Sequence, residues 1–392
     1  MKKIFELLTK NYTPVFIIFV LLSLTASIQA ILLGFHDAPD GSSVTYYNNF
    51  IIFKQSFFHL IENKDLYITY PEEHWDLYKY SPAFALLFAP LALLPVYLGL
   101  ILWNILNTLV LFFAIKNIPN IANRYKIFMF FIVAIEMMTS VQNAQSNSLI
   151  AGLFIFSFIF MEKKNFFVAA LFITLTVYIK LFGLVAFSLF LFYPKRLKFI
   201  SYSALWMALF AILPLIIIPY SQLTFLYNSW AHLLVNDHTT SFGLSVLGWL
   251  NAWFNISVNK NLLLLTGAII FMIPFVKIKH YNNYAFRLMM LASVLIWVVI
   301  FNHKAESPTF IIAMSGVVIW YYSMPRKTGD TILLILAFIF TSLSVTDIFP
   351  SFIRHDYFSS YVIKAVPCIF IWGKLIYDLL FNIKKTEKLK IS

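Results

Sequence analysis

The sorting of charges between the connections of this chain constrains its fold more than any other feature. When the apolar stretches are laid out as membrane spans, 21 of the 29 Lys and Arg residues fall on alternate connections. The remaining connections carry seven of the eight His and eleven of the 17 Asp and Glu residues. Connections rich in Lys and Arg stay on the cytoplasmic side of a membrane. The sequence therefore predicts a polytopic membrane protein whose acidic, His-bearing connections face outward, and we expect its chemistry on that outer face.

Composition supports the same class. The chain has 392 residues, of which 61% are hydrophobic and only 12% are charged, and such a chain is typical of a helical membrane protein rather than a soluble globule. We predict an all-α fold that forms a single membrane domain over residues 1–392, with about 11–13 membrane segments. The first apolar stretch, Pro14 to Leu33, is long enough to be a retained signal anchor, so both termini should be cytoplasmic.

The charge pattern also limits the partners. The net charge of +12 is explained by the bias between connections, so a lipid bilayer is expected as a partner and nucleic acid is not. The single cysteine, Cys368, excludes an intramolecular disulfide and a cysteine-based metal site.

Two outer connections are long enough to carry structure of their own, at residues 35–80 and 221–260. Within the first, Asn48 to Leu60 has one broad apolar face with Lys54 and His59 largely elsewhere, which predicts an amphipathic helix lying in the membrane interface. This connection is also dense in ionisable side chains, among them Asp37, Asp40 and Asp76.

Two apolar segments do not fit a simple sequence of spans. Residues 82–116 hold a short run, a break at Leu94-Pro95 and a full-length run, so one of the two runs should dip into the membrane and return. Residues 166–192 are too long for one span yet return to the side they left, which predicts two short helices that meet at Lys180. An ammonium at that apex would bind an anionic group such as a lipid phosphate, although snorkelling to the interface is the alternative.

Polar side chains at the tips of other outer hairpins are further candidates for a substrate site. Gln145 and Asn147 offer amides suited to sugar hydroxyls, with helix capping as the alternative. Residues 302–307 place five polar side chains in six positions, among them His303, Lys304 and Glu306. Glu136 could pair with Lys180 or belong to the same cavity, since an ionisable residue inside a membrane segment is costly and often functional.

Several of these residues belong to runs that resemble a known family. The runs are Asn63-Lys64-Asp65-Leu66-Tyr67, Leu77-Tyr78-Lys79-Tyr80-Ser81-Pro82-Ala83-Phe84-Ala85, Pro90-Leu91-Ala92-Leu93-Leu94-Pro95, Trp103-Asn104-Ile105-Leu106-Asn107, Gln145-Ser146-Asn147 and Ile179-Lys180. In order and in placement on one membrane face, they resemble the polyprenol-phosphate-dependent mannosyltransferases of glycosyltransferase family 87.

The resemblance implies a GT-C type enzyme with its active site on the outer face of the plasma (inner) membrane. Such an enzyme moves a sugar, a hexose such as mannose, from a polyprenyl-phosphate donor to a glycolipid or glycan acceptor with inversion. A donor without a pyrophosphate relaxes the need for a divalent metal, and the first outer connection has no Asp-x-Asp pair, so we expect no metal and no cofactor. The resemblance places a general base in that connection, at Asp40 or Asp37. In the family pattern an Asp stands only a few residues before a Tyr, whereas Asp40 lies six residues before Tyr46, so Asp76 and Glu306 remain possible substitutes. Tyr80 is expected at the substrate.

Two other functions are alternatives to this interpretation. A transporter or lipid flippase would use Lys180, Glu136 and Glu306 as a polar pathway, although no inverted repeat is visible in the sequence. A polymerase or ligase acting on undecaprenyl-diphosphate sugars would need paired Arg residues on the outer connections, where only Arg354 lies.

Overall fold

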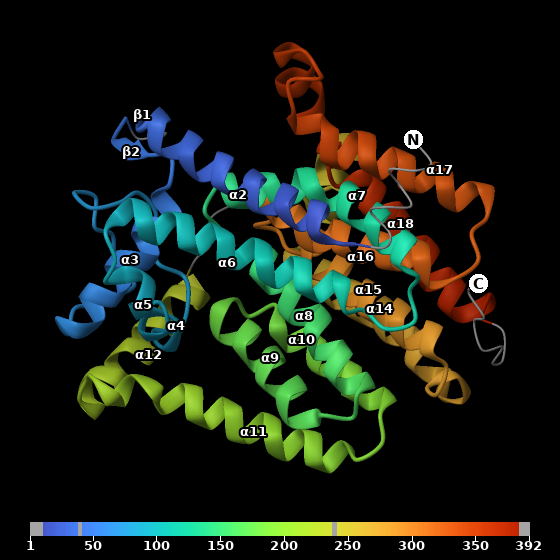
Figure 1. Ribbon diagram of the computed structural model, residues 1–392, viewed down its shortest axis with the longest axis horizontal. Coiled ribbons are helices and arrows are strands. Elements are labelled where there is room, and N and C mark those ends of the chain that lie inside the picture. Colours follow the sequence, from blue (N-terminus) through green and yellow to red (C-terminus); the bar gives the residue numbers. More distant parts are fainter. Residues whose placement is uncertain (1–10, 38–40, 237–240, 384–392) are drawn as a thin grey trace.

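A computed structural model describes residues 11–37, 41–236 and 241–383 of the chain (Figure 1). The described part is mainly helical, and five of its helical segments are long and apolar enough to cross a membrane. They are α2 (Thr13–Leu33), α6 (Val96–Lys116), α7 (Asn123–Gln142), α11 with its extension (Arg196–Ile216) and α17 with its extension (Thr328–Val345). The prediction of a helical membrane protein is thus confirmed. Five further apolar helical segments are shorter, so the total of about 11–13 membrane segments stays a prediction.

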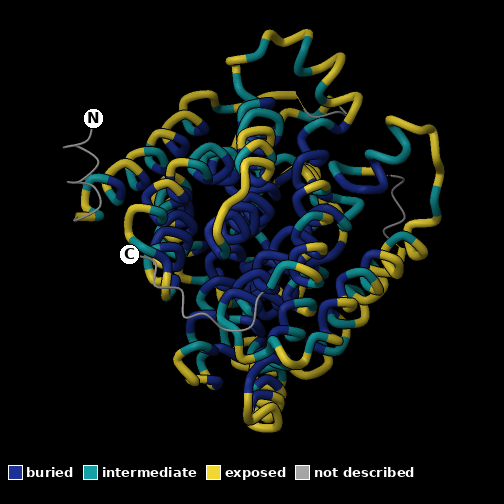
Figure 2. The backbone as a smooth tube through the Cα atoms, turned by 90° about the vertical axis from the view of Figure 1, so that its right-hand side faces the viewer, coloured by how far each residue is buried: buried dark blue, intermediate teal, exposed yellow. Residues whose placement is uncertain are grey.

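The centre of the molecule is a pair of helices, α15 (Tyr284–Ile300) and α16 (Phe310–Ser323), whose residues are almost all buried. Gly316 lets the two helices approach closely, because a Cβ atom there would lie 2.8 Å from the carbonyl oxygen of Ala292. Figure 2 shows this buried interior and the exposed outer faces of the surrounding helices. On α11 (Arg196–Ile212) large apolar side chains are exposed, as expected for a surface that meets lipid.

The remaining helices surround this pair or lie at its ends. They are α3 (Asn48–Ile61), α4 (Pro82–Leu87), α5 (Ala89–Ala92), α8 (Asn147–Glu162), α9 (Phe166–Ile179), α10 (Gly183–Ala186), α12 (Tyr220–Asn236), α13 (Val246–Phe254), α14 (Lys260–Met272) and α18 (Val366–Phe381). The second long outer connection therefore contains two helices, α12 and α13.

One element departs from the all-α prediction. Strands β1 (Phe35–Asp37) and β2 (Ser43–Thr45) form a short antiparallel hairpin directly after α2, with Phe35 opposite Thr45 and Asp37 opposite Ser43. Strands of three residues are too short to show an alternating pattern, which is why the sequence did not indicate them. Figure 1 places this hairpin at the same end of the molecule as α3, α4, α5 and α12.

The helix predicted in the first outer connection is present as α3, and its apolar face packs on α4 and α5. His59, which the sequence pattern placed away from this face, is only 3% exposed and its Nε2 lies 2.9 Å from a Glu73 carboxylate oxygen. The reason is that Glu73, 14 residues away, provides a polar partner for a side chain that would otherwise avoid burial. That α3 lies in the membrane interface stays a prediction.

The two irregular apolar segments divide into helices where the sequence indicated, and the dip of one run of residues 82–116 into the membrane stays a prediction. In residues 82–116 the first run forms only the short helices α4 and α5, whereas the second forms α6 and is long enough to cross. In residues 166–192, α9 ends at Lys180, whose backbone is extended (φ −142°, ψ 135°), and the chain continues as α10 and a short 3-10 helix, Phe187–Phe192. Gly183 permits the turn, because a Cβ atom there would lie 2.3 Å from Thr176 Oγ1.

Candidate functional site

Polar side chains from three separate connections meet in one hydrogen-bonded chain. Lys180 Nζ donates to Asn147 Oδ1 at 2.9 Å, and Asn147 Nδ2 donates to Gln145 Oε1 at 2.6 Å. Gln145 Nε2 in turn donates to Glu306 Oε2 at 2.8 Å. We call these four residues the outer polar chain, after the connections that are predicted to face outward. It runs from a half-buried ammonium, through two buried amides, to an exposed carboxylate.

Helix α6 fixes the connection that carries the two amides. Trp103 Nε1 donates to the carbonyl oxygen of Ala144 at 2.8 Å, and Asn107 Oδ1 accepts from the backbone N–H of Leu149 at 3.0 Å. These contacts hold both sides of the turn between α7 and α8. The Trp103–Asn107 run of the sequence therefore acts as the support of the polar chain.

The first outer connection reaches the same place through Tyr80 and Ser81. Ser81 donates to the carbonyl oxygen of Tyr178 through both its N–H, at 3.3 Å, and its Oγ, at 2.6 Å. The carbonyl oxygen of Tyr80 accepts from the Tyr67 hydroxyl at 2.9 Å, and the ring of Tyr80 lies 5.9 Å from Lys180 Nζ. Ser81 also caps α4 by accepting from the Phe84 N–H. The Tyr-Lys-Tyr-Ser-Pro run, residues 78–82, thus holds the first outer connection beside Lys180.

The charge of Lys180 has no acidic partner in contact. Among residues 11–37, 41–236 and 241–383, no carboxylate oxygen lies within 4.0 Å of its ammonium. Burial lowers the pKa of Lys180 to about 8, while the field of Glu306 opposes this shift and that of Lys79 adds to it. The side chain is therefore mostly cationic near neutral pH. An ammonium has three donors, and the contact to Asn147 uses one of them.

Three further residues were predicted at the site: Asp76 in the first outer connection, and His303 and Lys304 in the turn that carries Glu306. The Asp76 carboxylate is exposed and accepts from Lys79 Nζ at 2.9 and 3.0 Å, so its partner is Lys79. His303 and Lys304 precede Glu306 in the turn between α15 and α16, and the backbone N–H of Leu244 holds that turn by donating to the carbonyl oxygen of Ala305 at 2.8 Å.

Of the two residues predicted as general base, the structure describes only Asp37. Asp37 is exposed at the end of β1, whereas Asp40 lies outside the described residues. The hairpin leads into α3, where Asn49 Nδ2 donates to the carbonyl oxygen of Asn143 at 3.0 Å, two residues before Gln145. The hairpin is therefore linked through α3 to the turn that carries Gln145.

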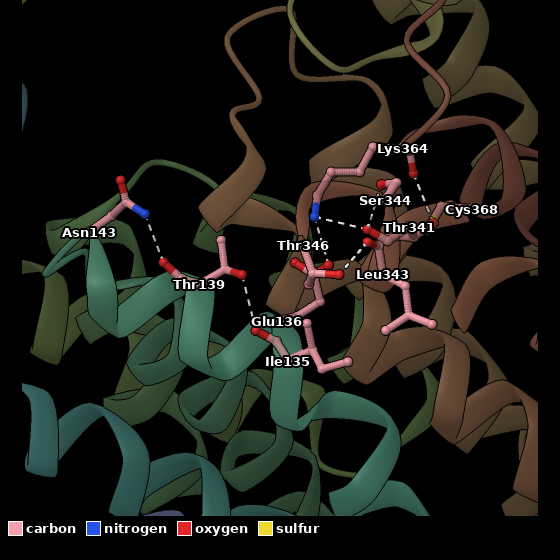
Figure 3. A network of polar contacts seen from close by, with 10 residues as sticks. All are labelled: Ile135, Glu136, Thr139, Asn143, Thr341, Leu343, Ser344, Thr346, Lys364 and Cys368. Carbon is pink, nitrogen blue, oxygen red and sulfur yellow. Dashed lines mark hydrogen bonds and ion pairs between the residues drawn. The ribbon is translucent and has the colours of Figure 1, made fainter. Parts of the chain in front are cut away.

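Glu136 has a different partner from the one considered in the sequence. Its Oε1 lies 2.6 Å from Lys364 Nζ, and both side chains are buried (Figure 3). Lys364 also donates to the carbonyl oxygen of Thr341 at 2.9 Å. Glu136 therefore does not pair with Lys180. It forms an ion pair with Lys364, which lies in the segment before α18, far away in the sequence. A transporter was expected to use Lys180, Glu136 and Glu306 as a polar pathway, and the ion pair occupies one of these three residues.

Lys364 was missed in the sequence. The signal that could have found it is its position in an apolar C-terminal stretch, where a lysine needs a buried acidic partner and Glu136 is the acid left inside a predicted span. Ser146, which is fully buried between Gln145 and Asn147, was quoted only as part of a motif.

The fold and the site of the chain are those of a helical membrane protein with a polar centre at one end. The family model of glycosyltransferase family 87 matches residues 78–301, which is more than half of the chain. The chain belongs to this family and is a glycosyltransferase. No curated protein matches it. The matched residues include Tyr80, Gln145, Asn147 and Lys180, whereas Glu306 and the first outer connection up to Leu77 lie outside them.

Proposed function

We propose that this glycosyltransferase moves a sugar, a hexose such as mannose, from a polyprenyl-phosphate donor to a glycolipid or glycan acceptor on the outer face of the membrane. The observation that carries the proposal is the Lys180 ammonium, which is half-buried, has no carboxylate in contact within the described residues and is held by an amide. An ion that protein groups leave without a counter-charge is suited to an anionic substrate.

The phosphate of the donor is assigned to Lys180. When the bond between the anomeric carbon and the phosphate oxygen breaks, the polyprenyl phosphate leaves as a monoester and gains negative charge. A positioned ammonium stabilises that charge more in the transition state than in the ground state, which accelerates the reaction. His303 and Lys304, in the turn that carries Glu306, are assigned to the same phosphate. Asn147 and Gln145 orient Lys180 and offer amide groups to the sugar hydroxyls.

The acceptor hydroxyl needs a base on the opposite side of the sugar. Its oxygen attacks the anomeric carbon as the phosphate leaves, and its proton passes to a carboxylate, so the configuration inverts. We assign this role to Asp40 or to Asp37, which lies at the end of β1. Glu306 and Asp76 are the two competing carboxylates, and Glu306 is the one bonded into the outer polar chain.

The test is a transfer assay with the purified full-length chain and a polyprenyl-phosphate mannose labelled in the sugar. Asp40→Asn is expected to lower transfer by about 100-fold or more while donor binding is kept, because a general base contributes roughly 10²–10⁴ in rate. Asp37→Asn, Asp76→Asn and Glu306→Gln are measured beside it, and the variant that loses turnover without losing donor binding identifies the base. Movement of the labelled donor across a vesicle with no new glycosidic bond would overturn the proposal.

The orientation of the site has its own test. We expect reporter fusions after Lys126, Lys164 and Lys327 to report the cytoplasm, because these connections carry the Lys and Arg excess. An outer signal at Lys164 would place Lys180 on the wrong face and would contradict an outward-facing site.

A further inference from the structure

A second charged region lies far from the outer polar chain, where α11 begins. A hollow of about 1170 Å³, open solvent included, is formed there by residues 192–198 on one side and by Ile278, Tyr281 and Asn282 on the other. The far end of α11 is near Lys180, because the Tyr178 hydroxyl donates to the carbonyl oxygen of Met207 at 2.6 Å. With a rise of about 1.5 Å per residue, the 11 residues from Arg196 to Met207 separate the two regions by roughly 17 Å. The hollow is therefore distinct from the proposed donor site.

The hollow has a cationic wall. Lys195, Arg196 and Lys198 line it and are exposed, and within the described parts of the chain none of the three forms an ion pair. The nearby carboxylate of Glu162 is already bound, because Arg287 contacts its two oxygens at 2.6 and 2.8 Å and the Tyr193 hydroxyl donates to it at 2.5 Å. No Asp or Glu is among the residues that line the hollow. The wall thus presents three positive charges with no counter-charge from its own lining.

Apolar surface adjoins these charges. The ring of Phe192, which is buried, packs edge-on against the ring of Tyr281 with centroids 4.9 Å apart, and both residues line the hollow. At the rim, Leu197 is 80% exposed and Ile278 is 68% exposed. Cations that line a concave site, with exposed aliphatic side chains between and opposite them, match a ligand that has both an anionic and an apolar part.

We infer that this hollow binds the headgroup of an anionic glycerophospholipid, whose phosphate contacts Lys195, Arg196 and Lys198 and whose acyl chains lie along Leu197 and Ile278. Basic pockets between helices at a membrane surface are suited to such headgroups. The phosphate is shared with free inorganic phosphate, but the exposed aliphatic rim favours the lipid. The inference does not depend on the sugar that the enzyme transfers.

The experiment measures lipid binding by native mass spectrometry of the purified full-length chain. Dioleoyl phosphatidylglycerol is the anionic probe and dioleoyl phosphatidylcholine is the neutral one. The test variant is Lys195→Gln with Lys198→Gln. The matched control is Lys163→Gln with Lys164→Gln, which removes two exposed lysines from the connection between α8 and α9. We expect the wild-type chain to prefer phosphatidylglycerol, the test pair to weaken its binding by about tenfold or more, and the control pair to change it by less than about twofold.

Three results would overturn the inference. Equal binding of the two lipids would remove the anionic preference, and equal losses in the two variants would mean diffuse surface charge rather than a site. If millimolar inorganic phosphate displaced phosphatidylglycerol and the acyl chains added no affinity, the hollow would be a site for a free anion. Thermal unfolding of both variants checks that the fold is kept, and Lys195→Arg with Lys198→Arg should restore lipid binding if the charge itself is required.

Discussion

Two lysines of this chain lie in largely apolar surroundings, and they are held in opposite ways. Lys364 is 2.6 Å from the Glu136 carboxylate and also donates to the Thr341 carbonyl oxygen, so its charge is neutralised inside the protein. Lys180 contacts an amide oxygen instead, and no carboxylate of the described residues lies within 4.0 Å of it. A buried charge without a partner is costly. The cost at Lys364 is offset by the ion pair, whereas at Lys180 it leaves a charge that an anionic substrate can satisfy.

The two sites also differ in their relation to the family. The match to glycosyltransferase family 87 includes Lys180 and both amides that hold it, but it ends before Lys364. The ion pair joins α7, inside the matched residues, to the segment before α18, outside them. We therefore propose a role in the reaction for Lys180 and a structural role for the Glu136–Lys364 pair, which attaches the C-terminal part to α7.

The largest effect is expected when the charge of Lys180 is removed. Lys180→Met should lower sugar transfer by about 100-fold or more and weaken donor binding, because loss of one positioned transition-state donor costs roughly 10²–10³ in rate. Thermal unfolding should change little, since no ion pair is broken. The measurement is transfer by the purified chain at saturating acceptor, with Lys180→Arg as the control that keeps the charge. Full activity of Lys180→Met would mean that the ammonium only snorkels and would end the distinction between the two lysines.

The opposite pattern is expected at the second lysine. Lys364→Met leaves the Glu136 carboxylate buried without its cation, so the unfolding free energy should fall by about 3–5 kcal/mol. Transfer per folded molecule should stay near that of the wild type. Unfolding of the purified chain gives the stability, and the double variant Glu136→Leu with Lys364→Met should recover most of it, because it removes both charges together. If Lys364→Met instead lost turnover in a fully folded chain, the pair would belong to the reaction.

The contrast shows what sequence can and cannot predict here. The helix break at Lys180 and the division of residues 82–116 into short helices and one long helix follow from segment length and from the side on which basic connections should lie, so both were predictable. Gln145, Asn147 and Glu306 were proposed because a polar apex between apolar spans is costly. Their hydrogen-bonded connection to Lys180 depends on the tertiary structure and cannot be predicted from their spacing in the sequence.

The features that escaped prediction depend on distant partners or on very short elements. Glu136 and Lys364 are 228 residues apart, and no local pattern relates them. The burial of His59 depends on Glu73, and the β1–β2 hairpin has only three residues in each strand. Each of these outcomes was decided by tertiary pairing rather than by periodicity.

The pH dependence of transfer should report the unpaired state of Lys180. Burial lowers the pKa of this ammonium from its usual value to about 8, so the cation is present below pH 8 and is lost as the pH rises. Transfer that depends on this charge should fall about tenfold between pH 7 and pH 9. The profile of kcat/KM is the measurement, and Lys180→Arg should remove the alkaline fall because arginine stays charged. A wild-type profile that stays flat to pH 9.5 would contradict the role.

The smallest effect is expected when Lys180 is given an acidic partner, as Lys364 has in Glu136. Asn147→Asp keeps the shape of the side chain but places a carboxylate where Lys180 Nζ now meets an amide oxygen at 2.9 Å. The new ion pair should raise the pKa of Lys180 and move the alkaline fall of transfer to higher pH. It should also compete with the donor phosphate and weaken donor binding by about fivefold, which corresponds to about 1 kcal/mol, the size of one typical net hydrogen bond. Gln145→Glu is the comparison variant, because its carboxylate would lie one step further from Lys180 and would face the Glu306 carboxylate, so it should shift the profile less. If Asn147→Asp left both the profile and donor binding unchanged, the ammonium would already be neutralised in the working enzyme, and the difference between the two lysines would be one of position alone.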